Sequence, residues 1–154
     1  MHDQWRLTAF RAAHAQALEL RPKARAVLEG LGGVPELAAR YEAAGPAWTL
    51  FAGGRPLACG GVVRFWPGAG ELWCWFAADV REHAVVVARH ARRAMSALLE
   101  GHGFARLQAH VRADDEQAQL FVAFVGLRRE GTCQGYGPDQ ATHHLYGRFW
   151  QWKA

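Results

Sequence analysis

Apolar and polar positions alternate along this chain with a period that changes several times, and each change predicts a new element. Residues 5–13 alternate with a period of two, which predicts a first strand with Leu7 and Ala9 on one face. Apolar positions then recur at helical spacing, and proline and glycine mark where helices begin and end. Three helices are therefore expected, over residues 15–20, 21–31 and 34–44.

The middle of the chain returns to a period of two. Residues 48–52 and 56–66 predict two strands joined by a Gly53–Gly54 turn that requires positive φ. Gly60–Gly61 predicts a bulge or a close approach between neighbouring strands. After a further turn, residues 71–78 are apolar on both faces, as expected of a central strand.

The second half begins with residues 84–99, which have the clearest amphipathic helical pattern in the chain. A strictly alternating strand follows over 106–112. Asp114 or Asp115 can cap the next helix, which extends to Val125. That helix is apolar nearly all round, so we expect it to be buried. Two more extended segments are expected, at 131–136 and 143–150.

The order of these elements predicts the fold class. An antiparallel meander followed by a β-α-β crossover indicates an α+β fold, in which helices flank a mixed β-sheet. The chain has 154 residues and shows no internal repeat or linker. We therefore expect a single domain over residues 1–154.

Composition removes several classes of protein. With 51% hydrophobic residues the chain is not disordered, and no stretch approaches the roughly 20 apolar residues of a membrane span. The first residues lack the pattern of a signal peptide, which favours a cytoplasmic location. The only serine, Ser96, lies in a helical pattern, so a serine-nucleophile hydrolase is excluded.

The cysteines and histidines do not predict a metal site. The three cysteines are far apart and are expected to be buried free thiols in a reducing compartment. His143 and His144 point to opposite faces of a strand, so they do not bind one metal. His83 and His90 share one side of a helix, without a carboxylate or cysteine at ligand spacing.

Other polar and aromatic residues allow two interpretations each. His110 lies with Arg106 and Arg112 on the polar face of a strand, where solvation is expected and an anion contact is the alternative. Trp73 and Trp75 share a strand face and are expected in the core or in a cleft wall.

Arginines and tryptophans near the surface suggest partners. Arg89, Arg92 and Arg93 form the solvated face of a helix, or contact the phosphates of coenzyme A or DNA. Trp150 and Trp152, near the end of the chain, predict docking onto this domain or onto a partner chain.

The order of elements resembles that of the GNAT family of N-acetyltransferases along almost the whole chain. Residues 48–66 resemble its hairpin, 71–78 its splayed central strand and 84–101 the helix below the cofactor pyrophosphate. Residues 103–127 resemble the next strand and helix. More narrowly, the chain resembles a GNAT-like family of tailed phages and prophages, some members of which are described as internal virion proteins. The similar segments are Leu20–Arg25, Gly45–Thr49, Val62–Gly68, Tyr136–Asp139 and Leu145–Phe149.

The resemblance implies acetyl-CoA, held by an Arg/Gln-x-x-Gly-x-Gly/Ala loop at the start of that helix. The loop aligns with His83–Ala88, where Val86 replaces the central glycine and crowds the anion. A shifted alignment gives Arg81 the first role but places Ala84 and Val86 at both glycine positions. The cofactor-binding residues implied by the resemblance are Trp75, Phe76, His83, Val86, Ala88 and Arg89.

A second departure concerns the catalytic groups. The family often has an Asn, an Ala and a proton-donating Tyr where this chain has Asp115, Ala118 and Val122, and valine donates no proton. Tyr136 or Tyr146 could substitute, although no spacing argues for either. Glu71 begins the central strand, where some GNAT enzymes place a general base; an edge glutamate that faces water is the interpretation we favour.

Three functions follow as expectations. The first is a phage or prophage GNAT-fold protein with a vestigial acyl-CoA cleft. It would be a structural or assembly component of the virion that associates with other virion proteins or with itself, in the host cytoplasm and in the particle. The second is an active acetyl-CoA-dependent N-acetyltransferase with a remodelled pyrophosphate loop. The third is a nucleic-acid-binding module that uses Arg89, Arg92 and Arg93.

Overall fold

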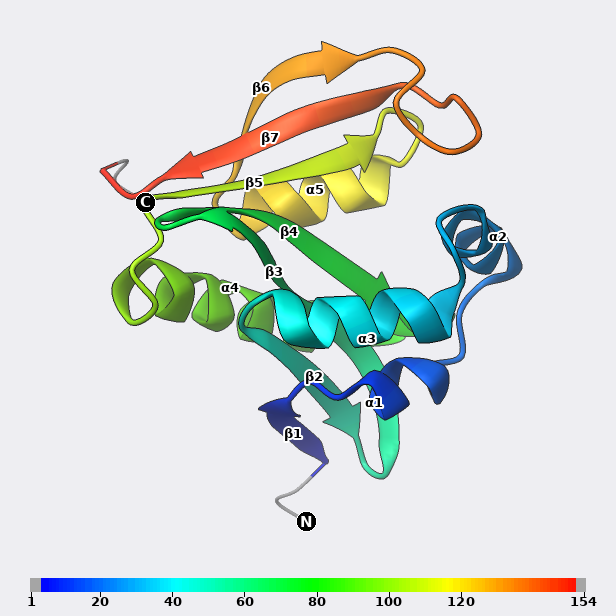
Figure 1. Cartoon of the computed structure of the whole chain (residues 1–154). Coiled ribbons are helices and arrows are strands. Elements are labelled where there is room, and N and C mark those ends of the chain that lie inside the picture. The colour runs from blue at the N-terminus through cyan, green and yellow to red at the C-terminus, as the bar shows by residue number, and fades with distance from the viewer. Residues whose placement is uncertain (1–3, 152–154) are drawn as a thin grey trace. The chain divides into compact units, whose positions relative to one another are not determined.

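The fold is known from a computed structural model, which describes residues 4–151 (Figure 1). In chain order its elements are β1 (Trp5–Ala9), α1 (Ala12–Gln16), α2 (Pro22–Gly30), α3 (Val34–Ala44), β2 (Ala47–Ala52), β3 (Arg55–Trp66), β4 (Ala69–Phe76), the 3₁₀ helix η1 (Val80–His83), α4 (Ala84–Glu100), β5 (Arg106–Arg112), α5 (Glu116–Phe124), β6 (Arg128–Cys133) and β7 (His143–Phe149). None of the helices in this range is long and apolar enough to cross a bilayer.

The strands form one seven-stranded sheet in the order β1-β2-β3-β4-β5-β7-β6. The β4–β5 pair is parallel, and the β1–β2, β2–β3, β5–β7 and β6–β7 pairs are antiparallel. This confirms the predicted α+β fold with a meander, a β-α-β crossover and flanking helices. The chain divides into two compact units, Met1–Val63 with Trp73–His90 and Arg64–Leu72 with Ala91–Ala154. The single-domain prediction stays a prediction.

Several predicted boundaries were wrong. The first strand ends at Ala9 instead of extending to residue 13, because α1 begins at Ala12 instead of residue 15. In the tail, β6 begins at Arg128, three residues earlier than expected. Gly126 has a φ of +105° and ends α5 in a tight turn, so the chain returns directly into a strand.

The first unit has its core on β2, which pairs with β1 on one side and β3 on the other. Leu50 and Leu57 are buried there, whereas Leu7 on the edge strand is exposed. Helices α1 and α3 contact one another beside these strands (Figure 1). Tyr41 of α3 lies 4.8 Å from Trp73 and 5.4 Å from Trp75 between ring centroids. Trp75 is buried in the core, one of the two places expected, and Trp73 is half-buried beside it in the same aromatic cluster.

A network of hydrogen-bonded polar groups crosses this core at Thr49, which is fully buried. The backbone N–H of Arg11 donates to Nδ1 of His14 over 3.2 Å, so this nitrogen is an acceptor. The Thr49 hydroxyl, 2.9 Å away, therefore also donates to it. The Cys59 thiol, 3.7 Å from Thr49 Oγ1, is then the donor to that oxygen. Burial raises the pKa of Cys59 to about 11, which keeps the thiol protonated.

The cysteine prediction holds only in part. Cys59 is buried and reduced, but Cys74 is exposed and Cys133 is half-buried. Apolar neighbours in the sequence do not determine what the rest of the fold packs against a given strand position.

The second unit is organised around β5, which pairs with β4 and β7. Its alternation is confirmed: Leu107, Ala109 and Val111 are buried, and the residues between them are half-exposed. Helix α5 contacts β5 (Figure 1). The hydroxyl of Tyr146 on β7 donates to Gln119 of α5 over 3.1 Å, which ties the helix to the sheet.

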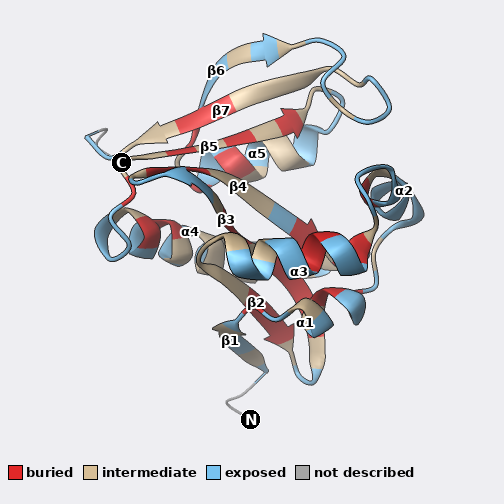
Figure 2. Ribbon diagram, viewed as in Figure 1, coloured by how far each residue is buried: buried red, intermediate tan, exposed pale blue. Residues whose placement is uncertain are grey.

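Helix α5 is capped as predicted but is not buried all round. Asp115 accepts the Ala118 N–H over 3.0 Å, which satisfies one of the orphan donors of the first turn. Val122 faces the core, whereas Leu120 is 66% and Phe124 47% exposed, and Figure 2 shows the mixed burial of this helix. An apolar composition does not bury a helix that the sheet covers on one side only.

Gly61 provides the close approach that the sequence predicts between strands. It pairs with Ala47, and a Cβ at Gly61 would lie 2.4 Å from the Ala47 Cβ and 2.5 Å from the Pro46 carbonyl oxygen. The register shift in this pair of strands lies elsewhere, between Leu50 and Phe51. Two β-strands therefore approach at Gly61 without room for a side chain.

Gly61→Ala is expected to lower the free energy of unfolding by about 1–3 kcal/mol, because the added methyl group meets backbone and a short side chain that cannot move aside. Chemical denaturation measures the change. Gly54→Ala is the matched control, since nothing lies within 4 Å of a Cβ at that turn position. Equal destabilisation by both substitutions would contradict the explanation.

Stability is expected to depend on pH through His14. Burial, followed by the charges of Arg11 and Arg6, lowers the pKa of this histidine below its ordinary value of 6.5. The unfolded chain therefore binds the proton more tightly, and the stability present above pH 6.5 is lost as the pH falls toward the folded pKa. The two donors to Nδ1 oppose protonation in the same sense.

Denaturation midpoints measured from about pH 7.5 to about pH 5.5 test this dependence. In His14→Gln the amide oxygen accepts the same hydrogen bonds without titrating, so the loss of stability over this range becomes smaller. The pKa of His144 is also lowered and supplies part of the remaining slope. An unchanged slope in His14→Gln would refute the assignment.

Candidate functional site

The shortest side-chain hydrogen bond among the described residues of the second unit joins Glu71 to His110. Glu71 lies on β4 opposite Gln108 of β5, and His110 is two residues further along the same face of β5. Glu71 Oε1 is 2.5 Å from His110 Nδ1, and the two side chains are only 23% and 15% exposed. Glu71 is therefore not an edge residue that faces water, and His110 is mostly covered instead of lying on an open polar face, so both interpretations were wrong. The neighbouring strand of the sheet buries them together.

The pair determines how the imidazole protons are arranged. A carboxylate has no proton to donate, so Nδ1 of His110 donates to Glu71. In the neutral ring, Nε2 then carries a lone pair. No residue in the described part of the chain hydrogen-bonds to Nε2, and it is not among the buried unsatisfied atoms, so solvent reaches it. A histidine oriented in this way by a carboxylate is suited to accept a proton.

The second oxygen of Glu71 is buried. Within residues 4–151, Oε2 has no hydrogen-bond partner and no contact with solvent. An unsatisfied buried acceptor costs free energy, and such groups persist where a function requires them. The hydrogen bond to His110 is therefore made by one oxygen of the carboxylate, and water does not reach the other.

The loop between β6 and β7 covers His110. Tyr136 stacks on the imidazole, with ring centroids 4.1 Å apart and planes inclined by 13°. The His143 ring packs edge-on against Tyr136, with 5.3 Å between the ring centroids. A Cβ at Gly137 would lie 2.8 Å from the His143 ring, so a side chain there would displace that ring.

Arg112 anchors the loop to β5. Its guanidinium contacts Asp139 of the loop over 2.7 Å and Asp114 over 3.1 Å. The hydrogen bond and charge of Arg112 hold the pKa of Asp139 below its ordinary value, so that carboxylate stays ionised. Because Arg112 is two residues beyond His110 on the same face of β5, one strand positions both the imidazole and its cover.

The predicted pyrophosphate loop lies in the first unit, where η1 continues directly into α4. The Ala84 N–H donates to the Arg81 carbonyl, so this amide is already satisfied. Val85 is 62% exposed, Val86 is half-buried, and the Val86 carbonyl contacts His90 Nδ1 at 2.9 Å. Every position of this turn carries a Cβ. These residues do not fit a glycine cradle for the pyrophosphate of acetyl-CoA.

The other residues that the resemblance assigns to the cofactor lie in two places. His83 stacks edge-on with Trp5 at 5.2 Å, and Ala88 and Arg89 follow on α4. Trp75 is buried in the aromatic cluster with Trp73 and Tyr41, and Phe76 is half-buried at the end of β4. Their role in cofactor binding stays a prediction.

Two carboxylates that sequence spacing missed lie beside His83. The ligand atoms of Asp79, Glu82 and His83 lie within 4.8 Å of one another. Sequence spacing indicated no carboxylate at ligand distance from His83. In the structure η1 winds more tightly than an α-helix, and this brings the three residues together. Arg55 already pairs with Asp79 through two hydrogen bonds of 3.0 and 2.7 Å, so we assign no metal to this cluster.

The residues predicted to meet partners are at the surface. Arg89, Arg92 and Arg93 are exposed on α4, and the Arg92 guanidinium lies 5.2 Å from the centroid of the Phe124 ring. Trp150 is 55% exposed, and its backbone N–H donates to the Ala105 carbonyl. Trp152 lies outside the described residues.

The sequence contained a weak signal for His110 and none for its cover. Strand alternation places His110 on the polar face of β5, but only the parallel register with β4 shows that Glu71 is its neighbour. Tyr136 is 26 positions away in a loop, and no periodicity connects it to His110.

Comparison with solved structures identifies the fold. The chain is similar to a GNAT-family acetyltransferase from Bacillus anthracis, with a TM-score of 0.76, 10% identity and coverage of 97% of each chain. It is also similar to the ribosomal-protein-S5-alanine acetyltransferase of Vibrio fischeri, with a TM-score of 0.71, 12% identity and coverage of 100% of this chain and 98% of that one. For a variant of spermidine N-acetyltransferase from Vibrio cholerae the TM-score is 0.70, with 11% identity over 97% of this chain and 95% of that one.

These likenesses show that the chain has the fold of the GNAT acetyltransferases. A scan against protein-family models and a search of curated proteins found no match. The fold alone leaves open which chemistry the site performs.

Proposed function

We propose that this protein transfers an acyl group to an amine and that His110, held by Glu71, accepts the proton that the amine loses. One observation carries the proposal: the hydrogen bond from Nδ1 of His110 to Glu71, which leaves Nε2 open to solvent. A base in this arrangement is needed for attack by an amine, because the nitrogen becomes acidic as it bonds to the acyl carbon.

Each residue of the cluster has a part in this step. Glu71 is a positioning residue: it fixes the ring tautomer and stabilises the imidazolium that forms when Nε2 takes the proton. Tyr136 stacks on the ring and limits its rotation. Arg112, through Asp139, holds the loop that carries Tyr136. The acceptor amine would therefore meet an imidazole that is already oriented, which lowers the entropic cost of reaction.

An acyl thioester such as acetyl-CoA would supply the acyl group: a C–N bond forms to the acyl carbon, the C–S bond breaks, and the thiolate leaves with its electron pair and is protonated from solvent. Since the turn from η1 into α4 does not fit the pyrophosphate, we expect weak donor binding and a high KM for acetyl-CoA. The similar structures are named as acetyltransferases of a protein alanine and of spermidine, both of which are amines. This supports an amine acceptor here without identifying it.

The proposal is tested with acetyl-CoA and two probe amines, spermidine and a peptide with a free N-terminal alanine, with the acetylated product measured by mass spectrometry. His110→Gln is expected to lower kcat at least about 100-fold, the usual contribution of a general base. Glu71→Gln is expected to lower kcat with little change in KM, because it disturbs the base and not the binding of either substrate.

Glu29→Gln is the matched control, since this exposed glutamate of α2 lies outside the cluster. It should retain wild-type kcat. Full activity in His110→Gln, or no acetylation of either amine by the wild-type protein at millimolar acetyl-CoA, would rule out the proposal.

A second candidate is a structural or assembly role in a phage or prophage particle, with a vestigial acyl-CoA cleft. It is favoured by the start of α4, where Val86 stands at the expected glycine and the Ala84 amide is satisfied. Association with other virion proteins or with itself, in the host cytoplasm or the particle, and nucleic-acid contact through Arg89, Arg92 and Arg93 belong to this candidate.

The virion role is tested by inducing the prophage, or infecting the host, and analysing purified particles by mass spectrometry. The chain is expected in the particles at a constant ratio to the major capsid protein. Its absence from washed particles, together with its presence in the cell lysate, would exclude the role.

A further inference from the structure

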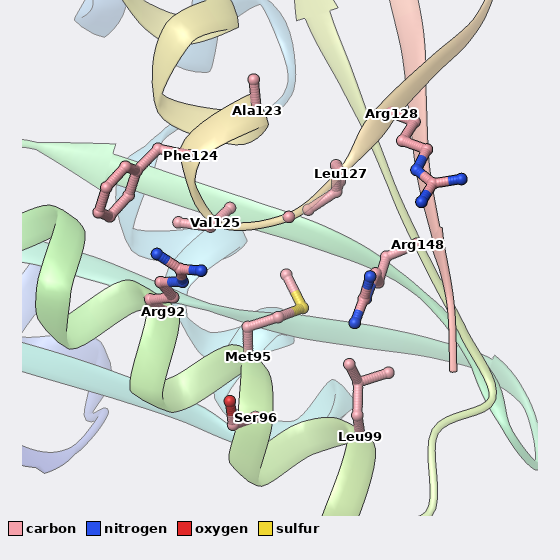
Figure 3. Close-up of a pocket in the computed structure, with 11 residues that line it drawn as sticks. Arg92, Met95, Ser96, Leu99, Ala123, Phe124, Val125, Leu127, Arg128 and Arg148 are labelled. Atoms are coloured by element: carbon pink, nitrogen blue, oxygen red, sulfur yellow. The ribbon is translucent and has the colours of Figure 1, made fainter. Parts of the chain in front are cut away.

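A pocket of about 270 Å³ lies in the second unit, away from the Glu71–His110 pair (Figure 3). It is lined by residues of the second half of α4, the end of α5, the start of β6 and the end of β7. Two arginine side chains face it, Arg92 of α4 and Arg148 of β7. Arg128 of β6 also lines it, but it pairs with Gly147, so its side chain lies on the opposite face of the sheet from Arg148. We call it the arginine pocket. The two arginines lie at one pocket only because the fold brings α4 and β7 together.

The charge of the arginine pocket is one-sided. Its lining residues include three arginines and no aspartate or glutamate. Arg148 is half-buried, and within the described range it has no ion pair or side-chain hydrogen bond. In Figure 3 its side chain extends from β7 toward Met95. Like charges around a concave site repel one another and concentrate anions from solution.

The position of Arg148 follows from the strand pattern. Tyr146 and Arg148 lie on one face of β7, and the Tyr146 hydroxyl contacts Gln119 of α5. Arg148 therefore points to the side of the sheet that the helices cover, and not to the open side. A cation on that side loses hydration without gaining a carboxylate partner, so an anion from outside would compensate it.

The floor of the pocket is apolar. Met95 is 7% exposed, Leu99 lies beside it on α4, and the Phe124 ring is at the edge under the Arg92 guanidinium. Figure 3 shows Arg92 and Phe124 on one side of the pocket and Arg148 on the other. A ligand with an anionic group and an apolar body would satisfy both surfaces.

We propose that the arginine pocket binds an organic phosphate, with the phosphate group between Arg148 and Arg92 and an apolar part on Met95 and Phe124. Guanidinium groups match the geometry of phosphate oxygens with paired hydrogen bonds, and a doubly charged phosphate balances both positive charges, which a carboxylate does not do.

The pocket is separate from the place where the GNAT resemblance puts a cofactor pyrophosphate. That place is the start of α4 at Ala84, whereas Arg92 is eight residues further along the helix, or about 12 Å. A different explanation is that the arginines only offset the negative end of the α5 dipole, which also lies at the pocket. The two explanations differ in whether a phosphate binds.

The test uses phenyl phosphate, which combines one phosphate with one aromatic ring, on the full chain by isothermal titration calorimetry. We expect saturable binding that weakens with added salt. Arg148→Gln should weaken binding about tenfold or more, because it removes a charged hydrogen-bond donor. Arg40→Gln, which removes an exposed arginine of α3, is the matched control and should bind as the wild type does.

Further arms separate the sources of the phosphate. Inorganic phosphate should bind more weakly than phenyl phosphate, because it lacks the apolar part. A single-stranded oligonucleotide that displaces phenyl phosphate from the wild type but binds poorly to Arg148→Gln would identify the phosphates of nucleic acid as the source. An oligonucleotide that does not compete would identify a small phosphorylated molecule.

Three results would overturn the proposal. They are no saturable binding of phenyl phosphate, equal binding by the wild type and Arg148→Gln, and equal losses in Arg148→Gln and Arg40→Gln. If Arg148→Gln lowers the melting temperature while the wild type binds no phenyl phosphate, the arginines serve the helix dipole. Circular dichroism of each variant at the titration temperature confirms that it is folded.

Discussion

The parallel pairing of β4 with β5 is the constraint on which the candidate site depends. It sets Glu71 opposite Gln108, so His110 lies two residues further along the same face of β5. Side chains alternate along a strand, and a slip of one residue would turn His110 toward the face that α5 covers. The same register places Arg112 on the open face, where it holds the loop that carries Tyr136. The β4–β5 register therefore determines the positions of His110, of Glu71 and of the loop that covers them.

Burial and charge are arranged differently at the two polar sites of the second unit. At the first site, Glu71 is partly desolvated but compensated by His110 on one oxygen. At the arginine pocket, Arg148 has no such compensation from the described chain. An uncompensated charge on the covered side of a sheet is unfavourable unless a ligand completes it. The Glu71–His110 pair therefore suits proton transfer, and the arginine pocket suits the binding of an anion.

Prediction from the sequence succeeded where one element contains the whole signal. The amphipathic period of α4 and the alternation of β5 need only local residues, and both are observed. It failed where burial depends on a neighbour. The apolar composition of α5 suggested a buried helix, but Leu120 and Phe124 are exposed because only one side meets the sheet. It failed again at Glu71, which pairs with His110 of the neighbouring strand β5 instead of facing water.

The sequence by itself determined the order of helices and strands, the α+β class and the loss of glycine at the start of α4, because periodicity, turn residues and side-chain volume are local properties. Only the tertiary structure decided which polar groups meet. Glu71 and His110 are 39 positions apart, and Arg92 and Arg148 are 56 apart. Strand register and helix packing bring such residues together, and neither leaves a periodic trace in the chain.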